Sequence, residues 1–325
     1  MIIVTGAAGF IGSQLIKKLN SENFNAIIAV DKFDNPVKNN NLKELKILER
    51  VDRDLFFNWI EKNYEQVEFM FHIGARTDTA EFDKSIFEAL NIGYSKRVWK
   101  SCIDYQIPLV YASSAATYGQ GEFGYIDSEE IIPSLKPLNP YGDSKNDFDA
   151  WAISQKEKPF YWAGLKFFNV YGPHEDHKGR MASVIWHSYH QIKKTGKMKL
   201  FRSHNPDFKD GEQRRDFVYV QDVVDACYYL MHLRKHSGIY NLGSGTSRTF
   251  LDLTRQVFRS MDVNEVIEFI DTPEDIRDKY QYFTEANMDK LRSIGYKKAF
   301  TTLESGVDQY VRDYLIPNPK PPVTR

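Results

Sequence analysis

The chain has 325 residues, and its 43 Lys and Arg residues against 44 Asp and Glu residues give a formal net charge of -1. This balance gives no reason to expect nucleic acid or an anionic membrane surface as a partner. The length suits one large α/β domain or two closely joined ones, and no apolar run approaches the length of a membrane span.

The N-terminal segment predicts a strand, a glycine turn and a helix. A short apolar run leads directly into the motif Gly6-x-x-Gly9-x-x-Gly12, and a helical pattern of apolar residues follows. Such a turn lets the backbone approach a pyrophosphate, and the helix dipole favours its negative charge. A second apolar strand ends in Asp31, roughly 20 residues further on, where an acid would hold a ribose hydroxyl. The chain therefore begins as a nucleotide-binding fold.

Strands and helices alternate through the rest of the first half. After a polar stretch to residue 41, the pattern predicts a helix at 54–63, a strand at 67–73, a helix around 85–105, a strand at 108–113, a helix beginning near 141 and a strand at 160–168. This β-α-β order predicts an α/β fold with a doubly wound parallel sheet, the Rossmann arrangement. Ligands of such sheets bind beyond the carboxyl ends of the strands.

The second half is less regular and predicts a smaller C-terminal α+β lobe. Its pattern contains a helix at 182–194, a charged loop at 203–215, a strand at 217–220 that rejoins the sheet together with the helix after it, and a strand at 239–243. We expect a nucleotide-binding domain at 1–170 that is rejoined by about 216–243, and a substrate lobe formed by 171–215 and 244–316. Residues 317–325 are rich in proline and are expected to form a loose tail.

Tyr141 and Lys145 are candidate acid–base residues. Their spacing places both side chains on one face of the helix that begins near residue 141. An ammonium beside a phenol favours the phenolate, which can take a proton from an alcohol. The strand before them runs into Ser113 and Ser114, and a small hydroxyl there can bind the substrate oxygen. Taken alone, Tyr141 and Lys145 could equally be surface residues, and the two serines could equally form a polar strand end without a function.

Taken in order, the glycine motif, Asp31, Ser114 and Tyr141-x-x-x-Lys145 resemble the extended short-chain dehydrogenase/reductase family, which includes nucleotide-sugar epimerases and dehydratases. Within this family the chain is most similar to the 6-epimerases of ADP-heptose, along nearly its whole length. The matching stretches are 111–119, 167–173, 177–184, 199–201, 215–220, 241–243 and 280–284. The most specific of them is the block His-Lys-Gly-x-Met-Ala-Ser at 177–183.

The resemblance implies an isomerase that inverts C6″ of an ADP-heptose by transient oxidation and re-reduction with a bound nicotinamide, in lipopolysaccharide synthesis. It implies that Tyr141 and Lys178 are the two acid–base groups. Lys145 would hold the ribose and tune Tyr141, and Ser114 would bind the reacting oxygen. From the residues alone, Lys178 reads as a solvated loop residue.

The resemblance also implies two sets of binding residues. The cofactor set is Gly6, Gly9, Phe10, Ile11, Gly12, Asp31, Lys32, Lys38, Arg53, Ile73, Gly74, Ala75, Arg76, Thr77, Asn91, Lys145, Val170 and Lys178. The substrate set is Ser114, Asn169, Arg180, His187, Phe201, Arg202, Ser203, His204, Arg215 and Tyr280. Arg180 departs from the family pattern, in which a small Ser can stand at this position.

The choice between NADP and NAD depends on the residues around Asp31. By itself this carboxylate favours NAD, because it repels a ribose 2′-phosphate. Lys32, Lys38 and Arg53 can supply compensating positive charge, and the related epimerases generally use NADP with a basic residue near the position of Arg53. We therefore expect NADP rather than NAD.

Three other functions are compatible with parts of the sequence. A 4,6-dehydratase of this family usually carries an Asp-Glu pair where Ala115 and Ala116 stand here, which argues against dehydration. A 4-epimerase is the alternative that stays open, although it would not require Lys178. A non-catalytic dinucleotide-binding protein would not need the serine, tyrosine and two lysines together.

The remaining expectations concern partners and compartment. The resemblance implies a homo-oligomer, a ring such as a pentamer, with a small ADP-sugar as substrate. Cys102 and Cys227 lie far apart and match no metal or redox spacing, so we expect no metal site and a reducing compartment. Because Ile2 already belongs to the first strand, no signal peptide is expected. The protein is predicted to be cytoplasmic.

Overall fold

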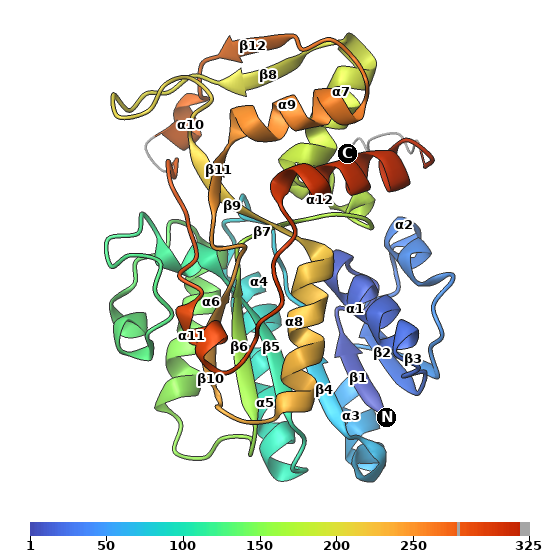
Figure 1. Ribbon diagram of the computed structural model, residues 1–325. Coiled ribbons are helices and arrows are strands. Elements are labelled where there is room, and N and C mark those ends of the chain that lie inside the picture. The colour runs from blue at the N-terminus through green and yellow to red at the C-terminus, as the bar shows by residue number, and fades with distance from the viewer. Residues whose placement is uncertain (278–279, 319–325) are drawn as a thin grey trace.

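The large sheet of the computed structural model has seven parallel strands in the order β10-β6-β5-β4-β1-β2-β3 (Figure 1). The structure describes residues 1–277 and 280–318. The strands are β1 Ile2–Thr5, β2 Ile27–Asp31, β3 Glu49–Asp52, β4 Phe69–His72, β5 Leu109–Ser114, β6 Trp162–Phe167 and β10 Gly238–Leu242. The strand order reverses between β1 and β4, which is where a doubly wound sheet opens a ligand crevice. The predicted Rossmann-type sheet is confirmed.

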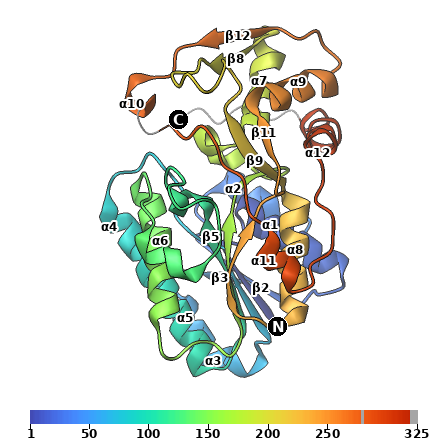
Figure 2. The ribbon, with the colours of Figure 1, turned by 60° about the vertical axis from the view of Figure 1, so that its left-hand side comes forward.

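Helices cover both faces of this sheet. The helices of this part of the structure are α1 Phe10–Ser21, α2 Pro36–Asn39, α3 Phe56–Asn63, α4 Lys84–Phe87, α5 Tyr94–Asp104, α6 Pro140–Ser154 and α8 Val220–Leu233. Figure 2 shows α5 and α6 on one side of the sheet and α1 and α8 on the other. The predicted helix around 85–105 consists of α4, a π-helical segment Glu88–Gly93 and α5. The apolar faces of these helices and the buried strands form one continuous core.

Strand β3 is an element that the sequence pattern does not predict. It lies at the edge of the sheet, beside β2. Of its four residues, Glu49 and Arg50 are exposed, and Val51 is the buried one. An edge strand of this kind carries too little apolar sequence to be recognised by its pattern.

The second part of the structure is the smaller lobe above the carboxyl ends of the strands (Figure 1). It contains a three-stranded sheet of β7 Asn169–Tyr171, β9 Arg214–Tyr219 and β11 Ser247–Thr249, and a two-stranded sheet of β8 Met198–Phe201 and β12 Ile267–Ile270. Its helices are α7 Val184–Thr195, α9 Phe250–Ser260, α10 Glu274–Arg277 and α12 Leu303–Gln309.

The expectation that the strand at 217–220 rejoins the large sheet is wrong. β9 pairs with β7 in parallel and with β11 in antiparallel orientation. Asp216 fixes it there, because its buried carboxylate accepts backbone N–H groups of Ser244, Gly245 and Ala286. The chain returns to the large sheet only afterwards, through α8 and β10.

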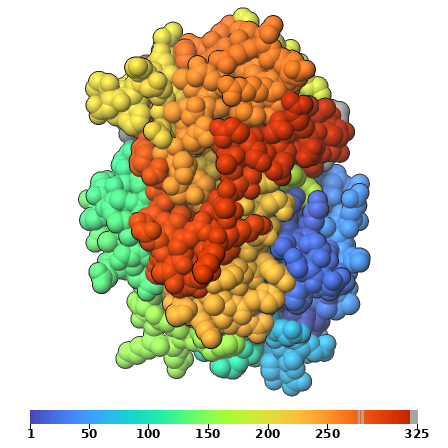
Figure 3. Space-filling model, viewed as in Figure 1, coloured from blue at the N-terminus to red at the C-terminus, as the bar shows by residue number. Residues whose placement is uncertain are grey.

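The C-terminal segment connects the two parts of the molecule, and Figure 3 shows it in red across the front of both. Helix α11, Asp289–Ser293, packs against β10 of the large sheet. The Asn241 side chain donates to the Asn287 carbonyl at 3.0 Å, and Lys290 donates to the Asp127 carbonyl at 3.1 Å. The chain then returns to α12, which packs on α9. Part of the segment 244–316 therefore lies on the sheet domain.

Two kinds of feature are absent from the described ranges. In residues 1–277 and 280–318, no helix combines the length and apolarity that crossing a bilayer requires. The same ranges contain no group of three or more His, Cys, Asp and Glu residues that could hold a metal ion. Residues 319–325 of the predicted tail lie outside the described residues.

Candidate active site

Two adjoining cavities lie at the carboxyl ends of the strands. The first, of about 340 Å³, lies over the glycine turn and the end of β2. The second, of about 390 Å³, lies between the end of β5, helix α6 and the lobe. Phe10, Ile73 and Lys178 line both cavities. A long ligand can therefore extend from the glycine turn to the residues of β5 and α6.

The glycine turn leaves no space for side chains. Gly6 has a φ of +66°, and a Cβ placed on it would lie 2.6 Å from the Cα of Gly74. A Cβ on Gly12 would lie 2.2 Å from the Gly6 carbonyl oxygen. Helix α1 begins at Phe10, so Gly12 lies in its first turn, and the N-cap residue Gly9 makes no side-chain cap. The turn thus presents bare backbone and a helix N-terminus to the cavity, which suits a pyrophosphate.

Asp31 ends β2 at the edge of the first cavity, where Lys38 and Arg53 also line the wall. Its carboxylate accepts the Ala8 N–H at 2.9 Å and forms an ion pair with the Lys38 ammonium at 2.6 Å. The Nε atom of Arg53 is buried and has no hydrogen-bond partner among the described residues. It lies 3.6 Å from a carboxylate oxygen of Asp54. A positive charge is therefore available beside Asp31.

Two residues of the predicted cofactor set lie elsewhere. Lys32 is absent from the described lining of both cavities, and its ammonium pairs with Asp54 at 2.7 Å. Asn91 is buried and accepts the Arg76 N–H at 2.8 Å while donating to the Arg76 carbonyl at 2.9 Å. It holds the backbone that lines the first cavity. The remaining residues of the set line one cavity or both.

Ser114, Tyr141 and Lys145 come together in the second cavity. Ser114 is the last residue of β5, and α6 carries the other two on one face. Pro140 and the capping side chain of Asn139, which accepts the Gly142 N–H at 2.9 Å, start α6 at the residue before Tyr141. The predicted juxtaposition of serine, tyrosine and lysine is therefore present.

Burial changes the ionisation of both residues on α6. It raises the pKa of Tyr141, and a hydrogen bond with Ser114 acts in the opposite direction. The Lys145 ammonium donates to the Ala112 carbonyl at 2.8 Å, and burial lowers its pKa to about 8. A lysine with this pKa remains largely protonated at neutral pH.

Lys178 lies in the turn Asp176–Met181 and lines the same cavity as Tyr141, but from a different element. Its ammonium lies 5.4 Å from the centre of the Phe10 ring. Burial lowers the pKa of Lys178, while the charge of Glu175 raises it. Glu175 is itself fully buried and accepts both the N–H and the hydroxyl of Ser183 at 2.6 Å. These contacts hold the turn beside the cavity.

The predicted substrate set divides into two groups. Ser114 and Asn169 line the second cavity. The other members are absent from its described lining and lie around the turn 176–181 and the lobe: Arg180, His187, Phe201, Arg202, Ser203, His204, Arg215 and Tyr280. Only the first group therefore lines the cavity that also contains Tyr141 and Lys178.

Contacts within the second group show how its members are held. The exposed Arg180 pairs with Asp78 at 2.9 Å. Buried Arg215 lies between two aromatic rings, 5.6 Å from the centre of Phe250 and 5.5 Å from that of Tyr280. Its guanidinium also donates to the carbonyl of Gln281, and burial lowers its pKa.

Sequence reasoning missed several residues that line the second cavity. Gln281 and Thr284 stand in the matching stretch 280–284, and Phe217 stands in the stretch 215–220, so a closer reading of these stretches would have found them. Thr79 and Phe250 carried no such signal. They reach the cavity because the loop after β4 and the start of α9 fold toward it.

Comparison with known proteins shows which proteins this chain resembles. Residues 2–243 match the NAD dependent epimerase/dehydratase family. Proteins named ADP-L-glycero-D-manno-heptose-6-epimerase from Fusobacterium nucleatum and Nitratidesulfovibrio vulgaris are 48% and 45% identical to this chain, and each comparison covers 97% of this chain and 98% of the relative. The solved structure of the Helicobacter pylori enzyme of the same name has a TM-score of 0.78 at 25% identity, covering 96% of this chain and 95% of that one. A UDP-glucose 4-epimerase from Thermotoga maritima has a TM-score of 0.78 at 23% identity, covering 98% and 99%, and shows the shared fold alone.

Proposed function

Because the chain belongs to the NAD dependent epimerase/dehydratase family, we propose that it converts ADP-D-glycero-β-D-manno-heptose into ADP-L-glycero-β-D-manno-heptose by inverting C6″. The product supplies heptose for the inner core of lipopolysaccharide. The observation that carries the proposal is that Tyr141 and Lys178 line one cavity from two different elements. Relatives that are 45–48% identical over nearly their whole length bear the name of this activity.

The reaction needs two proton-handling groups, because the hydroxyl at C6″ occupies two orientations, one in each epimer. When bound, the nicotinamide supplies removal and return of hydride at this carbon, so the reaction has no net redox change. Tyr141 takes or gives the hydroxyl proton in one orientation, and Lys178 does so in the other. Burial favours the neutral amine of Lys178, which can accept a proton.

Two further residues support the proton transfer. The Ser114 hydroxyl binds the reacting oxygen beside Tyr141. The Lys145 ammonium holds a ribose hydroxyl of the cofactor and stabilises the phenolate form of Tyr141 by its charge. The cavity that these residues share extends to the lobe, where Asn169 and Gln281 line it and can hydrogen-bond to the sugar part of the substrate.

The family uses a nicotinamide cofactor, and the first cavity fits one. The Cβ-free turn at Gly6 and Gly12 accommodates the pyrophosphate. The neighbourhood of Asp31 suits NADP better than NAD. The Lys38 ammonium already neutralises this carboxylate, and Arg53, whose Nε makes no hydrogen bond among the described residues, lines the same cavity with a guanidinium that can bind a 2′-phosphate.

The preference for NADP is tested by Arg53→Ala. A charge-assisted hydrogen bond contributes about 1.5–3 kcal/mol, so the ratio of NADH to NADPH dissociation constants should fall by about tenfold or more. Cofactor fluorescence titrations measure both constants. Lys32→Ala is the matched control, because its ammonium pairs with Asp54, and it should change the ratio by less than about threefold. An unchanged ratio in Arg53→Ala would remove Arg53 from the phosphate site.

Proton NMR of the purified protein with ADP-D-glycero-β-D-manno-heptose tests the activity itself. We expect the C6″ configuration to interconvert while the absorbance of free NADPH stays flat. If cofactor is bound but the epimers do not interconvert, the heptose assignment is rejected, and other nucleotide sugars are the next substrates to test.

The assembly and compartment belong to the same proposal. We expect a homo-oligomer, a ring such as a pentamer, in the cytoplasm. The two cysteines, Cys102 and Cys227, are buried free thiols, as suits a reducing compartment. Sedimentation velocity distinguishes a ring from a monomer.

A further inference from the structure

A buried ion pair lies directly beside the end of β5, outside the cavity lining. The ammonium of Lys166, on β6, is 2.8 Å from a carboxylate oxygen of Asp149, on α6, and neither side chain is exposed. Burying two charges costs free energy, which their attraction offsets only when further hydrogen bonds complete the site. The partners of this pair therefore indicate what it does.

The Asp149 carboxylate holds two residues of β5. One oxygen accepts the Tyr111 hydroxyl at 3.0 Å, and the other accepts the Ser113 hydroxyl at 2.6 Å. Between these two residues, the carbonyl of Ala112 accepts the Lys145 ammonium. Asp149 stands one helical turn after Lys145 on α6, so both side chains reach the same strand.

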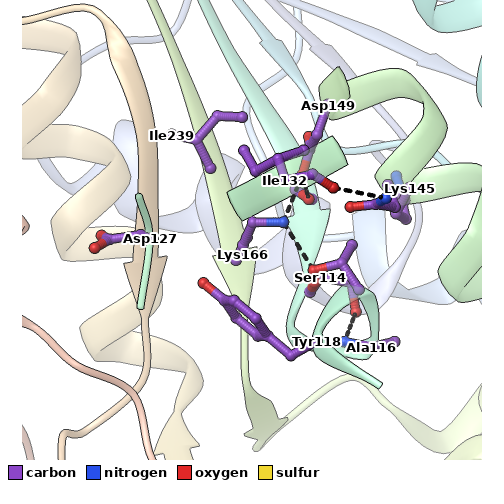
Figure 4. A network of polar contacts seen from close by, with 12 residues as sticks. Ser114, Ala116, Tyr118, Asp127, Ile132, Lys145, Asp149, Lys166 and Ile239 are labelled. Carbon is purple, nitrogen blue, oxygen red and sulfur yellow. Dashed lines mark hydrogen bonds and ion pairs between the residues drawn. The ribbon is translucent and has the colours of Figure 1, made fainter. Parts of the chain in front are cut away.

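The Lys166 ammonium reaches the next residue of β5 through a hydroxyl. It donates to the Thr117 side chain at 2.7 Å, and that hydroxyl donates to the Ser114 carbonyl at 2.8 Å. Figure 4 shows Lys166 with contacts to Asp149 and to the turn that follows Ser114. Each of the four residues 111–114 is thus tied to Asp149, to Lys166 through Thr117, or to Lys145.

The same carboxylate sets the charge around Lys145. The titratable groups around Lys145 come from five elements. Asp149 on α6 and His72 on β4 interact with its charge, Tyr141 on α6 and Lys178 in the turn 176–181 line the same cavity, and Tyr111 on β5 and Lys166 on β6 contact Asp149. Burial lowers the pKa of His72 to about 3, so this ring is neutral. Within this set, Asp149 carries the negative charge, and it raises the pKa of Lys145 against the effect of burial.

We propose that Asp149 and Lys166 are a positioning pair for proton transfer, which fixes the end of β5 under Ser114 and places a negative charge one helical turn from Lys145. This inference rests on the proposed function, in which Ser114, Tyr141 and Lys145 handle the hydroxyl proton. Neither member of the pair touches the substrate. They act through Ser114 and Lys145.

Asp149→Asn tests the pair, because the amide keeps the shape and an acceptor but removes the charge. Lys145 acts as an ammonium, so activity falls as the pH rises through its pKa. Without the Asp149 charge that pKa is lower, and the alkaline midpoint of kcat should move down by about one pH unit. This corresponds to about a tenfold loss of kcat above the midpoint. KM should change by less than about threefold, since the substrate contacts are intact.

Two further variants distinguish an effect on proton transfer from a general loss of fold stability. Asp222→Asn removes another buried carboxylate, whose hydrogen bonds go to Thr301, and it should lower the melting temperature without moving the midpoint. If Asp149→Asn does not fold, the neutral double variant Asp149→Asn with Lys166→Met replaces it, because a buried pair is often replaced as a unit without loss of the fold. It should show a smaller downward shift, since the unpaired charge of Lys166 is also gone.

A second measurement, the pH dependence of cofactor binding, tests the role of Asp149 without the sugar substrate. The affinity for NADP+, followed by protein fluorescence, should weaken as Lys145 loses its proton, and the midpoint of this change should also move down in Asp149→Asn. An unchanged midpoint in the folded variants, by kcat or by cofactor affinity, overturns the inference. If the wild-type protein fails to epimerise the sugar but the binding midpoint still shifts, the proposed function is rejected and the role of Asp149 stands.

Discussion

Tyr141→Phe is expected to lower the rate of epimerisation in both directions by a factor of about 10²–10⁴, the usual contribution of a positioned acid–base group. The substitution removes one oxygen and keeps the ring, whose centre lies 6.5 Å from that of Phe87. It also removes the hydrogen bond with Ser114. Proton NMR of C6″ under saturating substrate measures the loss, and KM should stay within about threefold because the cavity wall is unchanged.

Tyr161→Phe is the matched control for this experiment. Tyr161 is fully buried, and its hydroxyl has no hydrogen-bond partner among the described residues. Removing that hydroxyl should leave epimerisation unchanged and should not lower the melting temperature. If Tyr141→Phe behaved like Tyr161→Phe, Tyr141 would be a packing residue, and the assignment of the proton-handling group would fail.

The large sheet was predictable wherever its strands are buried on both faces. β4 and β5 read as short continuous apolar runs because helices cover both sides of them. β3 has one covered side chain and two exposed charged residues, so its sequence carries no such run. The strand exists because β2 offers it a free edge, which is a property of the sheet and not of its own residues.

The hydrophobic pattern of the sequence predicts strands but does not determine which neighbouring strand each of them pairs with. The sequence predicts a strand at 217–220, and residues 214–219 form one. Their assignment to the smaller sheet depends on Asp216, whose carboxylate meets backbone groups near residues 244 and 286. Contacts across such sequence separations leave no periodicity to read.

In the site, too, local sequence patterns predict some residues, and contacts between distant parts of the chain determine others. Tyr141 and Lys145 were predicted because one helical turn joins them. The role of Lys178 came from the resemblance alone, since its loop has no pattern that indicates burial. Asp149 and Lys166 were missed, although a lysine inside the otherwise apolar strand Trp162–Phe167 signals a buried partner. That partner stands on α6, where an aspartate is an ordinary surface residue.

Lys178→Met is expected to lower epimerisation by a factor of about 10²–10⁴. Met keeps the apolar stem beside Phe10 and removes the ammonium. Tyr141 alone serves one orientation of the C6″ hydroxyl, so the complete inversion should fail even though the cofactor still binds. NMR of the two epimers measures the loss, and a fluorescence titration checks the bound cofactor. Lys194→Met, at an exposed position on α7, should leave the rate unchanged.

Lys178→Arg decides which property of the lysine matters. A guanidinium keeps the positive charge but stays protonated at any working pH, so it cannot accept a proton. The buried amine can, because burial lowers its pKa. We therefore expect Lys178→Arg to be as slow as Lys178→Met. If the arginine restored the rate, Lys178 would act by its charge, and Tyr141 would transfer the hydroxyl proton in both orientations. The two-base reaction would then have to be replaced by a one-base reaction of the kind that a 4-epimerase requires.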